Sequence, residues 1–305
     1  MDTCFLSKKL KRKGFVNIGS SIFTEYEINE LSKLSKQVYI NLPDKHLDRI
    51  SAEQGGEGVR RLPQHNSRIA SIINKMFSHK AVKKILTDMM GSEYKIWGIH
   101  FRRSFPGESG LYLHQDALGQ VSIALSLDDN SDGEGATFFV PGSHWVPESL
   151  KKLNLELSHK LVSPLRFLFS PLLTRRGDIS IFTNRTWHGR LPNKTNQAHD
   201  VILIGMFPET CKFGYENWSN EFIDSIEGQE LHNLIEYPNN PTISLDRENN
   251  LDVSILKEEI FSLNIENPSV NSEVKQSLKL IGTIQFLKVV MKLKRLILPI
   301  IRLGR

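Results

Sequence analysis

This sequence has little cysteine, lacks long apolar runs, and has no acidic side chain near its C-terminus. Its two cysteines, Cys4 and Cys211, are too few for a disulfide framework or a thiolate metal cluster. No apolar run approaches the roughly 18 residues of a membrane-spanning helix. The N-terminal segment also lacks the long apolar stretch and small-residue cleavage site of a signal peptide. We therefore expect a globular protein that is made and kept in the cytoplasm.

The C-terminal segment, residues 275–305, is strongly basic. It contains eight basic residues and no acidic one. Subtracting these eight from the net charge of +5 leaves −3 for residues 1–274. A mildly acidic body does not suggest nucleic-acid binding, and we expect no nucleic-acid partner.

The same segment alternates large apolar residues with lysine and arginine. Lys288, Lys292 and Arg295 have the spacing of one polar stripe on an amphipathic helix, which Pro299 ends or kinks. Two interpretations stay open. The helix packs on the protein body, or it lies on an anionic membrane surface with its cations at the headgroups. We favour the membrane interpretation, which implies peripheral attachment and a lipid-like substrate.

Helical signals dominate the first 90 residues. Thr24 and Glu27 form a capping box before an amphipathic helix. Apolar periodicity predicts two more helices, over 66–77 and 79–90. Residues 40–65 are polar and rich in glycine, which is typical of a loop.

Short β-rich runs dominate the chain after Gly91 and are separated by Gly, Pro, Asn and Asp. They cover residues 94–103, 121–127, 136–140, 178–182 and 200–207, and a sixth run covers 15–18. Helices followed by many short strands favour an α+β fold with antiparallel sheets, either a sandwich or a jelly roll. We expect a core over 1–208, an extension over 209–274 packed on it, and the basic tail over 275–305.

The stretch GLYLHQDALG places His114 and Asp116 two residues apart at the end of a strand. Residues i and i+2 of a strand point to the same face, so the imidazole and the carboxylate project together. An isolated His-x-Asp is often only a polar pair at a surface. It also supplies two of the three ligands of a 2-His-1-carboxylate iron site.

His188 is the candidate for the third ligand. It follows the buried strand over 178–182 and precedes a glycine. Alone it would be read as a surface or core histidine. A second histidine at another strand end is what such a metal site requires, because the ligands must converge from different strands.

Three segments of the chain resemble the phytanoyl-CoA dioxygenase family, in the order in which the family has them: GFVNIGSSIFTEYEINEL, LHQDALGQVSIALSLDDNSDGEGATFFVPGSHW and GDISIFTNRTWHGRLPNKT. The similarity spans about residues 13–207. The resemblance implies a mainly β core, a double-stranded β-helix (jelly roll) flanked by N-terminal helices, and chemistry with Fe(II), O₂ and 2-oxoglutarate. It assigns His114, Asp116 and His188 as iron ligands, and it assigns His144 to a structural turn.

The chain departs from this family at one position. The family usually has an arginine eleven residues after the second histidine, which binds the 5-carboxylate of 2-oxoglutarate, and here that position is His199. A neutral imidazole cannot replace a bidentate guanidinium. Arg190 is the first candidate for the missing cation and Arg102 the second, although Arg190 could equally be a solvated loop residue. His199 itself could hydrogen-bond the cosubstrate.

The leading hypothesis is an Fe(II)/2-oxoglutarate-dependent dioxygenase that hydroxylates an unactivated C–H of a small-molecule or lipid-like substrate, producing succinate and CO₂. One alternative keeps the iron but does not use 2-oxoglutarate, as the substitution at His199 suggests. A second alternative is a jelly-roll module that binds a ligand without catalysis. The presence of all three metal-ligand candidates argues against the second alternative.

Overall fold

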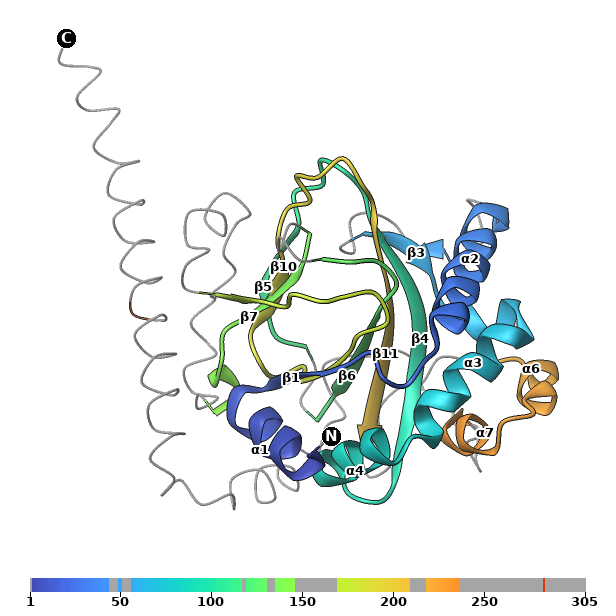
Figure 1. The fold of residues 1–305 in the computed structure, drawn as a ribbon, viewed down its shortest axis with the longest axis horizontal. Helices are drawn as coiled ribbons and strands as arrows, with labels where there is room; N and C mark the ends of the chain where they lie inside the picture. Colours follow the sequence, from blue (N-terminus) through green and yellow to red (C-terminus); the bar gives the residue numbers. More distant parts are fainter. Residues whose placement is uncertain are drawn as a thin grey trace, which may run out of the picture.

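The computed structural model describes residues 2–43, 49–50, 56–116, 119–130, 135–145, 169–208, 218–235 and 282. These residues form two β-sheets with helices on one side (Figure 1). One sheet has seven strands in the order β1-β9-β6-β11-β4-β3-β2, and the other has four in the order β5-β10-β7-β8. Every pairing between these strands is antiparallel. The predicted mixture of helices and antiparallel sheet is therefore confirmed.

The strands of the seven-stranded sheet are β1 (Phe15–Gly19), β2 (Arg49–Ile50), β3 (Glu57–Val59), β4 (Tyr94–Ser104), β6 (Val121–Ser126), β9 (Ile179–Thr183) and β11 (His199–Pro208). Those of the four-stranded sheet are β5 (Leu111–His114), β7 (Thr137–Phe139), β8 (Ser170–Pro171) and β10 (His188–Arg190). All six β-rich runs of the sequence are thus strands.

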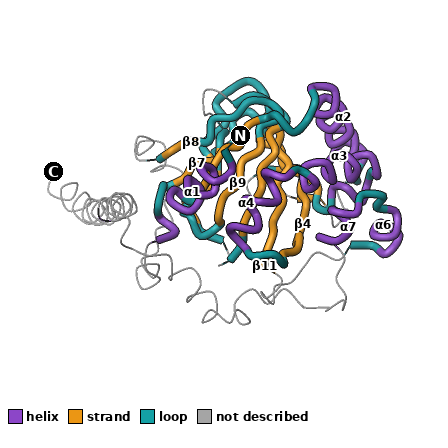
Figure 2. Tube along the Cα trace, turned by 60° about the horizontal axis from the view of Figure 1, so that its bottom comes forward, coloured by secondary structure: helices purple, strands orange, loops and turns teal. Residues whose placement is uncertain are grey.

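The helices are α1 (Thr3–Lys13), α2 (Glu25–Asn41), α3 (Ser67–Ser78), α4 (Lys80–Met90), α6 (Asn220–Ser225) and α7 (Gln229–Ile235), with 3₁₀ turns at η2 (Leu62–His65) and η3 (Ser143–Trp145). They cover one face of the seven-stranded sheet, and α4 lies across its strands (Figure 2). Alternate strand residues such as Ile123, Ile181 and Ile204 are fully buried against them. The other face of this sheet is turned toward the four-stranded sheet.

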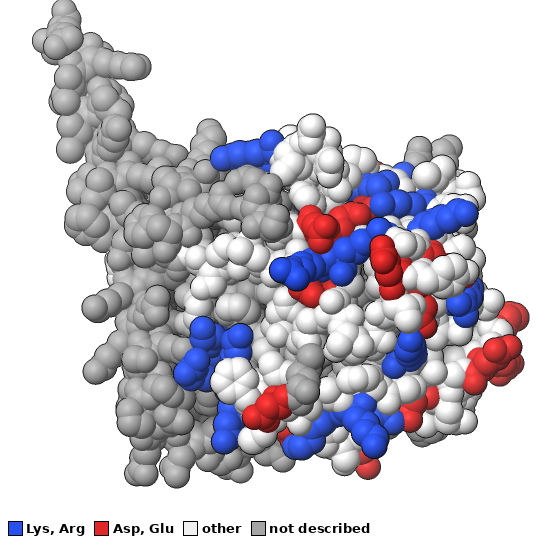
Figure 3. Space-filling model, viewed as in Figure 1, with Lys and Arg blue, Asp and Glu red and all other residues white. Residues whose placement is uncertain are grey.

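The predicted helices are present. Thr24 and Glu27 form the expected capping box at the start of α2, and α3 and α4 match the predicted 66–77 and 79–90 within two residues. Ion pairs such as Arg68–Glu30 and Lys75–Glu27 join α2 to α3. Basic and acidic side chains are intermixed on this side of the molecule (Figure 3).

The loop prediction for residues 40–65 is wrong in part, because β2, β3 and η2 lie within it. β2 and β3 have two and three residues, which is too short for an alternating pattern to stand out. They are strands because β3 pairs with the edge of β4 and β2 pairs with β3.

The sequence did not predict α1. Asp2 caps this helix by accepting hydrogen bonds from the backbone N–H groups of Cys4 and Phe5. Leu6 and Leu10 are its only buried large apolar residues, so its amphipathic pattern is weak. The helix is stabilised by tertiary packing against α4 and β1.

The C-terminal part of the chain is described only in places. Within the predicted extension over 209–274, α6 and α7 pack on the body, and Leu231 and Ile235 are fully buried in the main core. The predicted basic helix of residues 275–305 lies outside the described residues, apart from Gly282. None of the described helices is long and apolar enough to cross a membrane.

Gly14 ends α1 and positions the chain that leads to His188. It has φ +86°, and a Cβ at this position would lie 1.9 Å from Thr186 Oγ1. Its carbonyl accepts hydrogen bonds from Thr183 N and Thr186 Oγ1. α1 is thereby attached to the turn that connects β9 and β10.

We expect Gly14→Ala to lower the free energy of unfolding more than Gly19→Ala. Gly19 is a matched control, because its φ of +82° is similar but no atom of the described residues lies within 4 Å of its missing Cβ. Both variants incur the cost of a left-handed backbone, about 1–2 kcal/mol. Only Gly14→Ala must also displace Thr186. Urea unfolding of both variants measures the difference, and equal losses would show that the contact with Thr186 is not tight.

Candidate functional site

A cavity of about 710 Å³ lies between the two sheets. Its walls are the pocket-facing residues of β4, β11, β6 and β9 on one side and of β5, β10 and β7 on the other. Register explains which residues face it: Arg102, Val201 and Ser126 are directly opposite one another on neighbouring strands and therefore share a face. Their chain neighbours Phe101, Leu125 and Ile202 are fully buried in the main core instead.

His114, Asp116 and His188 converge in this cavity. His114 ends β5 and His188 begins β10, and the two residues are direct cross-strand partners. Their imidazole centroids are 4.4 Å apart. Asp116 Oδ1 lies 3.6 Å from His114 Nε2, and Asp116 Oδ2 lies 3.4 Å from His188 Nε2. One ligand atom from each residue lies within 4.8 Å of the others.

Backbone carbonyls orient both imidazoles. His114 Nδ1 lies 2.8 Å from the Tyr112 carbonyl, and His188 Nδ1 lies 2.7 Å from that of Thr186. An Nδ1–H that donates to a carbonyl leaves the Nε2 lone pair for a metal, which is the usual outer-shell arrangement of metal-binding histidines. Burial, followed by the proximity of His188, lowers the pKa of His114 and favours the neutral form that metal binding needs.

Asn184 holds the carboxylate of the group. Its side-chain amide donates to Asp116 Oδ2 at 2.7 Å, and its backbone carbonyl accepts from the Asp116 backbone N–H at 3.0 Å. The Asp116 side chain is 40% exposed, but the walls of the cavity still shield it from water. This desolvation alone would raise the pKa of Asp116. The hydrogen bond and the proximity of His188 have the larger opposing effect, followed by the proximity of His114 and the hydrogen bond from Asn184. Together they outweigh desolvation and hold the pKa of Asp116 well below its usual range.

The arrangement fits a divalent metal. Two neutral imidazole nitrogens and one ionised carboxylate are the donor set of the 2-His-1-carboxylate sites that hold non-haem Fe(II). Among the described residues, no other group of three histidine, cysteine, aspartate or glutamate side chains converges in this way. His144 is elsewhere: its Nε2 contacts the Lys11 carbonyl at 2.8 Å, beside α1.

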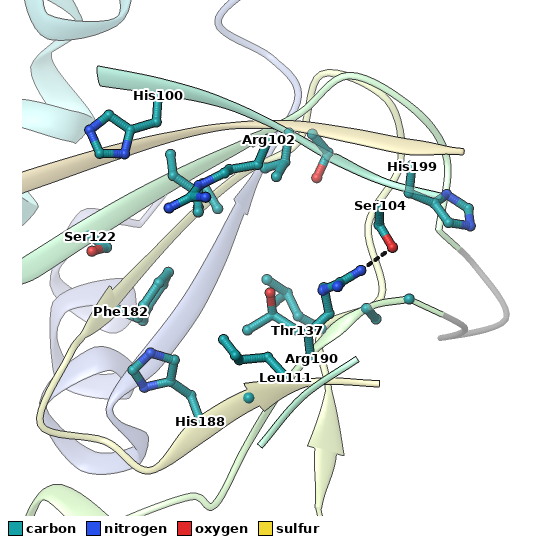
Figure 4. A pocket seen from close by; sticks show the side chains of 18 of the residues that line it. His100, Arg102, Ser104, Leu111, Ser122, Thr137, Phe182, His188, Arg190 and His199 are labelled. Atoms are coloured by element: carbon teal, nitrogen blue, oxygen red, sulfur yellow. Dashed lines mark hydrogen bonds between the residues drawn. The ribbon is translucent and has the colours of Figure 1, made fainter. Parts of the chain in front are cut away.

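Arg190, Ser104 and His199 lie together at another part of the cavity (Figure 4). Arg190 Nη1 donates to Ser104 Oγ, and Ser104 is the cross-strand partner of His199. Arg190 Nη2 also lies 2.7 Å from Glu108 Oε2. The buried atoms Arg190 Nε and His199 Nδ1 have no hydrogen-bond partner among the described residues.

Arg102 lies apart from this group. Its guanidinium projects into the cavity from β4, in the direction of Ser122 and Phe182 (Figure 4). Its Nη1 is 3.4 Å from the Gly56 carbonyl. The adjacent Arg103 makes a two-bonded ion pair with Asp200, at 2.9 and 3.0 Å.

The structure therefore brings together the three residues predicted to bind metal, and it places all three candidate cosubstrate residues in the same cavity. Sequence reasoning missed Asn184, Ser104 and Glu108. No spacing pattern marks them, because they contact the site across 68, 86 and 82 residues of chain.

Comparisons with solved structures show similarity to proteins that were solved with a metal and 2-oxoglutarate or that are described as non-haem and α-ketoglutarate-dependent. HygX from Streptomyces hygroscopicus, solved with nickel and 2-oxoglutarate, aligns with a TM-score of 0.54 and 16% identity over 70% of this chain and 89% of its own. The epimerase SnoN in complex with Fe³⁺, α-ketoglutarate and nogalamycin RO aligns with a TM-score of 0.52 and 16% identity, over 74% and 91%. At this identity the likeness establishes the fold.

The carbocyclase SnoK from nogalamycin biosynthesis, described as non-haem and α-ketoglutarate-dependent, aligns with a TM-score of 0.51 and 16% identity, over 67% of this chain and 83% of its own.

No curated protein matches the sequence significantly. The sequence model of the phytanoyl-CoA dioxygenase (PhyH) family matches residues 10–200, which is more than half of the chain and includes the whole metal-binding group. The chain therefore belongs to the phytanoyl-CoA dioxygenase family.

Proposed function

We propose that this protein is an Fe(II)/2-oxoglutarate-dependent dioxygenase that hydroxylates an unactivated C–H of a small-molecule substrate. The observation that carries the proposal is the convergence of His114, Asp116 and His188, with both imidazoles oriented through Nδ1. Bound Fe(II), with O₂ and 2-oxoglutarate, supplies oxidative chemistry that releases succinate and CO₂. Family membership and the structural neighbours support an oxygenase of this general kind.

We also propose that the two sheets form a double-stranded β-helix. Successive strands from β4 to β7 alternate between the sheets, since β4 and β6 belong to the seven-stranded sheet and β5 and β7 to the other. β9 and β11 return to the first sheet, and β10 between them to the second. This alternation supports a jelly roll and explains why the ligands come from two strands that are distant in sequence.

The protein's own residues prepare the site in three ways. The carbonyls of Tyr112 and Thr186 fix the tautomers of the two imidazoles, and Asn184 fixes the rotamer of Asp116. His114 and His188 on adjacent strands and Asp116 from the loop after β5 would hold the metal, and a set of three protein ligands would leave it further positions for the cosubstrate and O₂. The walls of the cavity bury most of the two imidazoles, since the His114 and His188 side chains are 19% and 8% exposed.

For the 5-carboxylate of 2-oxoglutarate we propose Arg190, assisted by Ser104 and His199. Arg190 is on the same strand as His188 and projects into the same cavity (Figure 4). Its Nε and His199 Nδ1 have no hydrogen-bond partner among the residues that the structure describes, and a carboxylate could satisfy both. Arg102 is the second candidate, because it faces the cavity from β4.

The alternative in which iron is used without 2-oxoglutarate rests on two observations. His199 stands where the family usually has arginine, and Arg190 already contacts the carboxylate of Glu108. Anaerobic titration of the Fe(II) protein with 2-oxoglutarate decides between the two functions. A metal-to-ligand charge-transfer band supports the proposed cosubstrate, and its absence supports the alternative.

His114→Ala, Asp116→Ala and His188→Ala are each expected to abolish Fe(II)-dependent turnover and to leave the fold intact. Each removes one of three ligands of a site that needs all three. Metal content after desalting and circular dichroism measure the two effects. His144→Ala is a control for loss of a histidine outside the group, and it should retain metal. Full activity of any of the three variants under limiting iron contradicts the assignment.

Arg190→Ala is expected to weaken 2-oxoglutarate binding strongly, whereas Arg102→Ala should change it little. Loss of a charge-assisted pair in a buried pocket costs on the order of 2–5 kcal/mol. The charge-transfer titration measures the dissociation constant for both variants. The reverse order of effects would move the carboxylate to Arg102, and no effect in either variant would favour the function without 2-oxoglutarate.

We further propose that residues 275–305 attach the protein to anionic membranes, which would make a lipid-like substrate accessible. The support is the sequence alone: eight cations, no anions and abundant large apolar residues. Such a segment adds about 1 kcal/mol of attraction for each basic residue near an anionic surface.

Deletion of residues 275–305 is expected to abolish binding to phosphatidylserine vesicles at low salt and to leave the body folded. Replacing Lys288, Lys292 and Arg295 with glutamine is the matched test of charge, because the apolar residues stay. Binding of the intact chain should weaken as salt rises. If the intact chain ignores these vesicles and the truncated chain aggregates, the segment packs on the body instead.

A further inference from the structure

The contact between Arg190 and Glu108 is an incomplete ion pair. Arg190 Nη2 and Glu108 Oε2 are 2.7 Å apart, and their side chains are only 13% and 17% exposed. Despite this distance the two atoms do not form a well-directed hydrogen bond: among the described residues, the buried Glu108 Oε2 has no hydrogen-bond partner. Arg190 Nε also has no partner in the described part of the chain. A guanidinium usually binds a carboxylate with two parallel N–H donors, and here Glu108 does not provide that arrangement.

The incomplete pair lies where the proposed function places the 5-carboxylate of 2-oxoglutarate. Ser104 Oγ accepts from Arg190 Nη1, and His199 is the cross-strand partner of Ser104. Two carboxylates cannot share this group favourably, because like charges in a desolvated site repel. The cosubstrate and Glu108 therefore compete for the same cation.

The loop that carries Glu108 is fixed, so the competition involves only a side chain. Between β4 and β5, the Gly107 N–H donates to the Asn193 carbonyl at 2.8 Å. The Glu108 carbonyl accepts from the Asn193 N–H at 3.0 Å. The fully buried Asn193 side chain also donates to the Ser104 carbonyl at 3.1 Å. Because these hydrogen bonds hold the backbone of Gly107 and Glu108, the Glu108 carboxylate can leave Arg190 by rotation of its own side chain.

We infer that Glu108 is a displaceable internal counter-ion of Arg190, and that 2-oxoglutarate replaces it when it binds. This inference rests on the proposed function and assigns a role to a residue outside the metal-binding group. Glu108 neutralises a desolvated arginine before the cosubstrate arrives, and it lowers the affinity of the site for the cosubstrate. It acts on cosubstrate binding through Arg190 and takes no part in the oxidation.

Glu108→Gln provides the test. We expect the dissociation constant of 2-oxoglutarate, from anaerobic charge-transfer titration of the Fe(II) protein, to fall by roughly three- to fivefold, the scale of an ion pair whose geometry is not ideal. Thermal melting should show a larger stabilisation by 2-oxoglutarate in the variant than in the wild type. Glu30→Gln is the matched control, since it removes the same charge from an ion pair with Arg68, between α2 and α3. It should leave the dissociation constant unchanged.

Glu108→Asp separates direct contact from charge alone. It keeps the negative charge but shortens the side chain by one methylene, so we expect its carboxylate to lie farther from Arg190 on the fixed loop. Displacement predicts tighter cosubstrate binding in this variant too, and it supplies the measurement if Glu108→Gln does not fold. Binding as in the wild type would show that only the charge of Glu108 matters, and the inference would be overturned.

The direction of the change distinguishes Glu108 as a competitor from Glu108 as a structural support. If Glu108 served to orient Arg190 for the cosubstrate, Glu108→Gln would weaken binding or leave it unchanged, and either result overturns the inference while the proposed function stands. A wild-type protein that binds Fe(II) but shows no charge-transfer band with 2-oxoglutarate fails at an earlier step. That result removes the proposed cosubstrate and the displacement together.

Discussion

The cross-strand pairing of His114 with His188 is the constraint on which the site depends. Directly opposite residues of an antiparallel pair have side chains on the same face and close together. A shift of one residue between β5 and β10 would turn one imidazole to the opposite face of the sheet. The register is held from both sides, because β10 also pairs with β7, where His188 is opposite Phe139. The metal-binding group is therefore a consequence of how three short strands align.

The seven-stranded sheet gives this alignment a rigid support. One face is buried under the helices, with residues such as Ile123, Ile181 and Ile204 fully enclosed. The other face carries the polar and small residues of the cavity, including Ser122 and Ser126. Because side chains alternate along each strand, the same strands provide the core and the binding surface. A substitution in the helix-facing core would disturb the cavity only through movement of the backbone.

Much of this organisation was predictable from the sequence, and the limit is set by distance along the chain. Strand alternation indicated that His114 and Asp116 face the same way, and the resemblance to a family related them to His188. Asn184 was not predictable, because its contact with Asp116 depends on how the turn after β9 meets the loop after β5. The same holds for Glu108, whose partner is 82 residues away. α1 was missed for a local reason, since only two large apolar residues are buried along it.

The exchange of arginine for histidine at position 199 has a geometric explanation in this cavity. Ser104 is the cross-strand partner of His199 and also accepts a hydrogen bond from Arg190. Positions 190 and 199 therefore lie at the same part of the cavity, although they belong to different sheets. A cation at either position could bind a carboxylate in this part of the cavity. The guanidinium of Arg190 would do so from β10, the strand that also carries His188. Arg190 donates a hydrogen bond to Ser104 and lies beside the carboxylate of Glu108. These contacts offset part of the free-energy cost of burying its charge. This geometry supports the proposal that the cosubstrate's carboxylate site has moved from one strand to another and has not been lost.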